Sequence, residues 1–393
     1  MSKTIFLSIA CDTDPDINPC CRVFGKENTG HIWQGITVGI DVLRQRMKDT
    51  YFLSRYKQFP VTWLLRADRQ IYELYGNAAF CFQKFEHIWK NEHNHGSEIG
   101  WHPHLYRWNE QGCRWIPYLG CDDDVEILKE CLYSLRQHMD ICAVRTGWDY
   151  HSNRLMNFFD EQGLLVDASA IPDCTHSGIW FYDWRGTMRT PFLPSKHDYR
   201  KRGVSPESSL KILEMPVLVR RLDLPLHILR YGIRNLRNLR AMSGSLQGYL
   251  TDWESARWQG ILLTSECKLF HEAAQQTLSA YSESEHVFLT TYFHTGELLS
   301  SSLMARFIRN LESLSSLAEK IGYTVVPTTL STAASLVKRL RMDSTGRHNP
   351  ALHLPLLMGP PKTHASFTAE SQAGAKQSDR LLIAKRTRSA NLP

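Results

Sequence analysis

The chain lacks the features that mark membrane-spanning and disulfide-stabilised proteins. No apolar run among its 393 residues approaches the roughly 18 that a membrane-spanning helix needs. The apolar segment after Lys3 is too short for a leader peptide, and we expect it to form a buried first strand. Ten cysteines are present, but no two are spaced as Cys-x-x-Cys. Several lie within apolar runs, which favours reduced thiols in a cytoplasmic protein over a disulfide framework.

A strong charge of either sign is also missing. Lys and Arg number 46, Asp and Glu number 40, and the net charge is +6 at pH 7. Much of the excess lies in residues 220–240 and after position 338, so charge gives no reason to expect a nucleic-acid partner. Residues 221–242 alternate Leu and Ile with Arg, which is typical of a basic amphipathic helix. Such a helix can dock on the protein's own core, on an acidic partner or, peripherally, on the inner face of a membrane.

Short apolar runs alternate with helical patterns along most of the chain. The runs predict strands at 4–10, 61–65, 97–101, 142–145, 164–168, 213–219, 286–293 and 323–326. The helical patterns cover 36–49, 78–94, 122–139, 152–162, 252–280 and 302–321. This alternation indicates an α/β protein with a mostly parallel sheet. The number of repeats favours an irregular (β/α) barrel of about seven strands over an open sheet.

The composition divides the chain into a folded domain and a tail. We expect residues 1–340 to form the barrel, with an insert at 172–245 that is rich in Pro, Gly, Trp and Arg. Residues 341–393 turn polar and basic, which predicts a disordered C-terminal tail.

Two short motifs stand where predicted strands end. Asp12-Thr13-Asp14 follows the first apolar run, and His102-Pro103-His104 follows residues 98–101. In extended backbone, residues i and i+2 point to the same side, and Pro103 biases His102 toward that conformation. Two imidazoles and up to two carboxylates can therefore converge, which is a donor set suited to a divalent metal.

Three more strand ends carry a polar residue. Arg145, Asp167 and His294 each follow a predicted strand directly. Any one of these positions has an ordinary explanation, since Asp-x-Asp is good turn chemistry and polar residues often end strands. Five such strand ends in one chain are harder to explain by packing, and they favour an enzyme whose site lies at the C-terminal ends of the strands.

The order of these motifs resembles the polysaccharide deacetylase family, the NodB-homology domain of carbohydrate esterase family 4, over about residues 3–330. The His-x-His form resembles a variant found in surface-glycan gene clusters. The family usually has adjacent aspartates and histidines four residues apart, whereas both pairs here are two residues apart. The resemblance implies the following roles: Asp12 as general base oriented by Arg145, His294 as general acid, Asp14, His102 and His104 as ligands of a divalent metal, most plausibly Zn²⁺, and Trp148, Asp167 and Trp184 as substrate-binding residues.

The function implied by the resemblance is removal of an N-acyl group from a sugar or glycan intermediate in the cytoplasm. Three alternatives stay open: a metal-dependent amidase acting on a non-sugar amide or imide, a non-catalytic glycan-binding relative, and a haloacid-dehalogenase-type phosphatase. The phosphatase would use Asp12 as nucleophile and Asp14 as acid, and it leaves His102 and His294 without a role.

Overall fold

The computed structural model describes residues 3–16, 32–56, 59–111, 114–117, 123–176, 181–222, 257–281 and 283–345. Most of the predicted basic helix at 221–242, much of the predicted insert at 172–245 and the predicted tail beyond 345 lie outside these residues. Six described cysteines are free thiols: Cys11, Cys81, Cys131, Cys142, Cys174 and Cys267. Within the described ranges, no helix combines the length and apolar character needed to cross a membrane.

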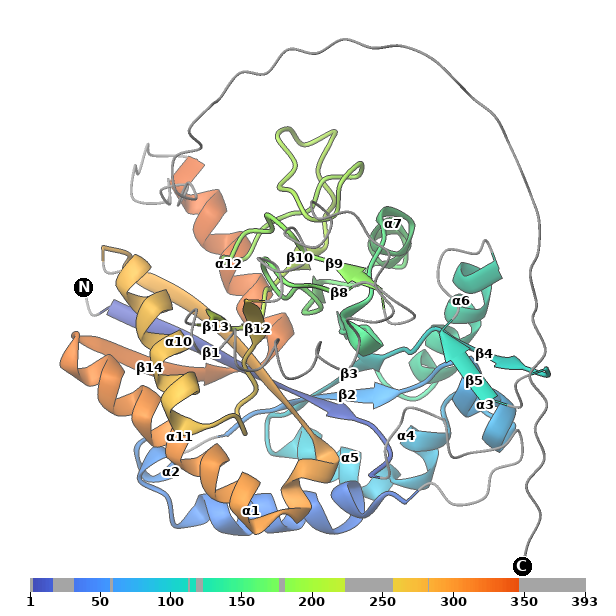
Figure 1. Ribbon diagram of the computed structural model, residues 1–393, viewed down its shortest axis with the longest axis horizontal. Coiled ribbons are helices and arrows are strands. Elements are labelled where there is room, and N and C mark those ends of the chain that lie inside the picture. The colour runs from blue at the N-terminus through green and yellow to red at the C-terminus, as the bar shows by residue number, and fades with distance from the viewer. Residues whose placement is uncertain are drawn as a thin grey trace, which may run out of the picture. The chain divides into compact units, whose positions relative to one another are not determined.

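A parallel sheet forms the centre of the domain (Figure 1). Its strands are β1 (Lys3–Thr13), β2 (Thr62–Arg66), β3 (Glu98–His102), β6 (Ala143–Val144), β7 (Val166–Asp167), β10 (Leu213–Glu214), β13 (His286–His294) and β14 (Tyr323–Thr328). The order is β10-β7-β6-β3-β2-β1-β13, with β14 beside the first half of β1. This confirms the predicted irregular (β/α) barrel of about seven strands.

The two ends of this strand order meet through a short seam. Val217, just after β10, forms a parallel bridge with Thr290 of β13, and the Leu218 N–H donates to the Thr290 carbonyl at 2.8 Å. The sheet therefore curls round until β10 approaches β13. As a result, the C-terminal ends of β1, β3, β6 and β13 face a common space.

Helices alternate with the strands, as the sequence predicts. They are η1 (Gly35–Gly39), α1 (Ile40–Lys48), α2 (Tyr51–Tyr56), α3 (Arg69–Tyr75), α4 (Phe80–Lys84), α5 (Glu86–Asn94), α6 (Asp123–Arg136), η2 (Gly147–Asp149), α7 (Asn153–Glu161), α10 (Cys267–Ala280), η3 (Thr295–Leu299), α11 (Ser301–Lys320) and α12 (Leu330–Thr345). Three small antiparallel pairs are formed by β4 (Tyr106–Asn109) with β5 (Arg114–Pro117), β8 (Thr175–His176) with β9 (Tyr182–Asp183), and β11 (Val219–Arg221) with β12 (Trp258–Gly260).

Burial on both faces explains why the sequences of the strands are continuous apolar runs. Strands of a parallel sheet covered by helices are buried on both faces. In β1, Ile5, Leu7 and Ile9 are at most 1% exposed, and the neighbouring Ala10 and Cys11 are fully buried as well. The acidic residue of β1, Asp12, lies at its C-terminal end, where the sheet meets the cavity described below.

Two predicted boundaries differ from the structure. Residues 252–280 were expected to be helical, but of the described part, 257–280, only Cys267–Ala280 forms a helix, and Trp258–Gly260 is a strand. Hydrogen bonds to distant segments decide this, because Gly260 pairs with Val219, and the Leu263 N–H donates to the Tyr292 carbonyl. The last helix also runs to Thr345, past the expected domain end at 340.

Candidate active site

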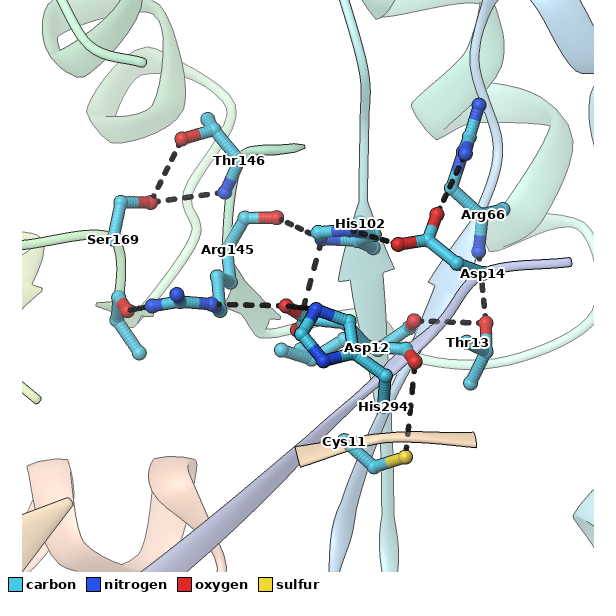
Figure 2. Close-up of polar contacts among 12 residues, drawn as sticks. Cys11, Asp12, Thr13, Asp14, Arg66, His102, Arg145, Thr146, Ser169 and His294 are labelled. Carbon is cyan, nitrogen blue, oxygen red and sulfur yellow. Dashed lines mark hydrogen bonds and ion pairs between the residues drawn. The ribbon is translucent and has the colours of Figure 1, made fainter. Parts of the chain in front are cut away.

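A cavity of about 430 Å³ opens at the C-terminal ends of the strands. Its lining includes six of the residues singled out from the sequence: Asp12, Asp14, His102, His104, Arg145 and His294. Figure 2 shows Asp12 beside Arg145 and His294, and Asp14 next to His102 and Arg66. Residues far apart in the sequence thus meet because their strands are neighbours: His294 is the register partner of Asp12.

Three of these side chains could hold a metal ion: Asp14, His102 and His104, each at most 7% exposed. The two Nε2 atoms of the histidines are 3.0 Å apart. Asp14 Oδ1 is 3.4 Å from His104 Nε2, and Asp14 Oδ2 is 3.7 Å from His102 Nε2. Ligands about 2.0–2.1 Å from a tetrahedral zinc would stand roughly 3.3 Å from one another. The donor set and its spacing therefore fit a zinc-type site.

The two imidazoles are held in different ways. His102 Nδ1 lies 2.8 Å from the Arg145 carbonyl oxygen, which can only accept, so Nδ1 carries the hydrogen and Nε2 faces Asp14 and His104. His104 follows Pro103 outside any strand, and its ring lies against Gly147. A Cβ on Gly147 would come within 2.2 Å of the His104 ring, so the residue at 147 has to be glycine for this arrangement.

The charges around the ligands shift the pKa values of the two histidines in opposite directions. Burial and the positive charge of Arg66 lower the pKa of His104 to about 4, which keeps that imidazole neutral as a ligand must be. Burial alone would lower the pKa of His102, but Asp12 and Asp14 outweigh it and raise that pKa. Burial likewise opposes ionisation of Asp14, yet His104, His102 and Arg66 hold the pKa of its carboxyl well below the usual range.

Asp12 occupies a different environment on the same strand. Its Oδ2 accepts a hydrogen bond from Arg145 Nε at 3.2 Å and lies 3.8 Å from His294 Nε2. Its Oδ1 has no hydrogen-bond partner within the described part of the chain, although it lies 3.8 Å from His102 Nδ1. One oxygen of Asp12 is thus fixed, and the other can accept a proton.

His294 has the character of an acid. Its Nδ1 lies 3.6 Å from Glu297 Oε1, while Glu297 Oε2 accepts from the His294 backbone N–H at 3.1 Å and from Thr264 Oγ1 at 2.8 Å. Burial favours the neutral imidazole, but Glu297 and Asp12 overcome this effect and raise the pKa of His294 to about 9. His294 is therefore an imidazolium at neutral pH, and 38% of its side chain is exposed.

The three predicted substrate-binding residues lie in different places. Trp148 lines the cavity, with its ring 6.2 Å from that of His104 between centroids. Trp184 is fully buried, and its Nε1 donates to the Asp149 carbonyl at 2.8 Å. Asp167 is also fully buried and accepts from His151 Nε2 at 2.6 Å. The structure therefore brings only Trp148 of these three into the described lining of the cavity.

Several residues of the site were missed by the sequence analysis. Glu297 stands three residues after His294 and forms a capping box with it, a signal that was available. Arg66 ends β2, so the strand-end rule that found the other residues applied to it as well. Asp149 and Tyr292 have no such signal. Burial raises the pKa of Asp149 to about 6 although Arg145 opposes the shift, and the Arg145 guanidinium lies 3.9 Å over the Tyr292 ring.

No protein-family model matches the chain, and no curated protein sequence does. Among solved structures, the chain is similar to a proposed polysaccharide deacetylase from Mycobacterium smegmatis, with a TM-score of 0.47 and 13% identity over 87% of this chain and 92% of that chain. A proposed polysaccharide deacetylase from Pseudomonas aeruginosa PAO1 has a TM-score of 0.45 and 12% identity, covering 86% and 92%. A third, involved in O-antigen biosynthesis in Bordetella bronchiseptica, has a TM-score of 0.27 and 12% identity, covering 85% and 90%. The conclusions about activity below rest on the site itself.

Proposed function

We propose that this chain is a metal-dependent hydrolase that removes an N-acyl group, taken as N-acetyl, from a sugar or glycan intermediate. The observation that carries the proposal is the meeting, in one cavity, of a three-ligand metal group with a carboxylate and an imidazolium 3.8 Å apart. Metal-assisted amide hydrolysis uses all of these parts, because the carbonyl must be activated and the amine is a poor leaving group unless it is protonated.

Asp14, His102 and His104 would hold the divalent cation. Imidazole and carboxylate donors suit zinc, and the cation, when bound, supplies a Lewis acid for the amide carbonyl. His102 keeps its Nε2 directed at the site through the Nδ1–H contact with the Arg145 carbonyl. The low pKa of His104 leaves its imidazole free of a proton at neutral pH.

The remaining residues move the protons. Asp12, held by Arg145, takes a proton from the water whose oxygen attacks the acyl carbon. The C–N bond then breaks as His294 Nε2–H gives its proton to the departing nitrogen. The products are a carboxylic acid and an amine; Asp12 then releases its proton to solvent and His294 takes one up, which restores both residues. The pKa of about 9 suits His294 to the acid role, because the imidazolium predominates at neutral pH.

The charge of the lining favours a neutral substrate at the reacting end. Five carboxylates line the cavity, whereas Arg145 is already committed to Asp12 and Asp149. The haloacid-dehalogenase-type alternative is disfavoured because it gives no role to His102 or His294, which line the same cavity. Trp148 offers an aromatic surface for a sugar ring at the same opening.

The test is a deacylation screen with zinc-loaded and chelator-treated protein. Free, nucleotide-linked and lipid-linked N-acetyl sugars, together with a linear imide, would be assayed for acetate or amine release. We expect zinc-dependent release from at least one sugar substrate, abolished in Asp12→Asn and His294→Ala. Turnover of the imide alone would point to an amidase, and fully loaded protein with no turnover of any substrate would point to a binding protein.

A further inference from the structure

Arg66 connects the metal group to the sheet beneath it. It is the last residue of β2 and is 1% exposed. Its guanidinium donates through NH1 to Asp14 Oδ1 at 2.6 Å, through Nε to Asp68 Oδ2 at 2.7 Å and through NH2 to Gln70 Oε1 at 2.9 Å. Its backbone N–H donates to Thr13 Oγ1 at 3.1 Å. The backbone of Arg66 is therefore held by this contact with β1 as well as by its place in β2. Figure 2 shows Arg66 reaching the carboxylate of Asp14.

Asp68 extends this connection to a second ligand. It is fully buried, and its Oδ2, which accepts from Arg66, also accepts from the His104 backbone N–H at 3.1 Å. Its Oδ1 accepts from the Ile71 N–H at 3.0 Å and so caps helix α3. The carboxylate is therefore satisfied on both oxygens, and the ion pair with Arg66 has excellent geometry in a buried position.

We propose that Arg66 and Asp68 are positioning residues that place Asp14 and His104 for the cation. This inference rests on the proposed metal centre. His104 lies beyond the end of β3, so its backbone N–H does not donate to a neighbouring strand. The carboxylate of Asp68 accepts this hydrogen bond instead. Through Arg66 the same carboxylate is tied to Asp14. One ion pair thus fixes two of the three ligands relative to each other, as the short His-x-His spacing requires.

The charges of the pair also matter to a cation. Arg66 brings a positive charge into contact with Asp14, and Asp68 offsets that charge at 2.7 Å. The Asp14 carboxylate therefore still attracts the cation, while its contact with Arg66 holds it rigidly in place. Removing Asp68 alone would leave an uncompensated guanidinium beside the ligand and weaken cation binding.

The experiment is a calorimetric titration of the chelator-treated full-length chain with Zn²⁺, together with thermal unfolding of each cation-free variant. Arg66→Lys keeps the positive charge but loses the fork that reaches both carboxylates. Asp68→Ser keeps a hydroxyl to cap α3 but is too short for Arg66 and the His104 N–H. We expect the zinc affinity of each to fall about 10–100-fold, the usual effect of losing a residue that supports a metal ligand.

Arg44→Lys is the matched control. Arg44 also forks onto a buried carboxylate, Glu92, and donates to the Phe59 carbonyl and to Ser97, and none of these partners is a metal ligand. We expect this control to lower the unfolding temperature without changing the zinc affinity. The inference is overturned if Arg66→Lys and Asp68→Ser unfold earlier but bind zinc as tightly as wild type. Should Arg66→Lys fail to fold, the affinity of Asp68→Ser decides. Absence of zinc binding in the wild type would instead overturn the proposed metal centre.

Discussion

The two sides of the cavity differ in how rigidly their side chains are held. On the Asp14 side, all three ligand side chains are at most 10% exposed, and Arg66, Asp68 and the Arg145 carbonyl hold them through short contacts. On the His294 side, the imidazole is 38% exposed and is held chiefly by Glu297 in the next turn. A metal group needs fixed distances, whereas an acid has to exchange its proton with solvent in each cycle. Strand β1 serves both sides, because Asp12 lies near its C-terminal end and Asp14 follows it directly.

The largest effect is expected from Asp12→Asn. The amide cannot take a proton from water, so kcat should fall by about 10³-fold, within the range that general base catalysis contributes. Because Asp12 stands outside the ligand set, zinc affinity measured by calorimetry should stay near the wild-type value. A large loss of zinc affinity would instead place Asp12 among the ligands and remove the distinction between the two carboxylates.

His294→Ala should have the next largest effect, about 10²-fold on kcat. The loss should depend on the leaving group, because protonation matters for an amine and much less for a phenolate. Comparing an N-acetyl sugar with an aryl acetate measures this difference. Equal losses on both substrates would argue against His294 as the general acid.

Gly147→Ala tests the rigid side without replacing a ligand. The new Cβ would fall within 2.3 Å of three atoms of the His104 ring, so His104 must move. We expect zinc affinity to fall about tenfold, in the lower part of the range for disturbed ligand support. Gly163→Ala is a control for loss of a glycine outside the cavity lining, since a Cβ there meets no atom within 4 Å although its positive φ of 71° adds strain. It should alter stability only.

Glu297→Gln should give the smallest change, which is confined to the pH profile. Glu297 counteracts the effect of burial on His294, so its loss should lower the pKa of His294 from about 9. Activity needs the imidazolium and is lost as pH rises through this pKa. The alkaline limb of the kcat profile should therefore move to lower pH, and NMR titration of the His294 ring should show the same shift. Thr264→Val, which removes one contact to Glu297, should shift the limb less. An unmoved limb would show that another group controls it.

The sequence predicted those parts of the site that follow from strand periodicity. Asp12, Asp14, His102, His104, Arg145 and His294 were found because each ends a strand, and parallel strands bring their ends together. Their catalytic roles remain predictions. Arg66 satisfied the same rule but was passed over, because a single Arg after an apolar run is common and its partners, Asp14 and Asp68, are only visible in three dimensions.

Side-chain burial was the part that the sequence could not supply. Trp184 and Trp148 both stand in polar, loop-like sequence, yet one is fully buried and the other lines the cavity. The difference depends on long-range packing: Trp184 lies against His151 and Tyr199 at ring distances of 5.4 and 4.9 Å, neither of which periodicity can locate. Residues 258–263 were misjudged for the same reason, because their hydrogen bonds go to β11 and β13.

The strands paired with β1 determine which parts of the domain can open to solvent. This strand is paired along one edge with β13 and along the other with β14 and then β2, whereas the seam near Val217 rests on an isolated bridge. Amide hydrogens in the middle of β1 can therefore exchange with solvent only when the whole domain unfolds, while those at the seam exchange through small local openings. Asp12 is paired on both edges of β1, and Asp14 follows the strand directly, so we expect thermal fluctuations that loosen the barrel at its seam to leave the two carboxylates in place.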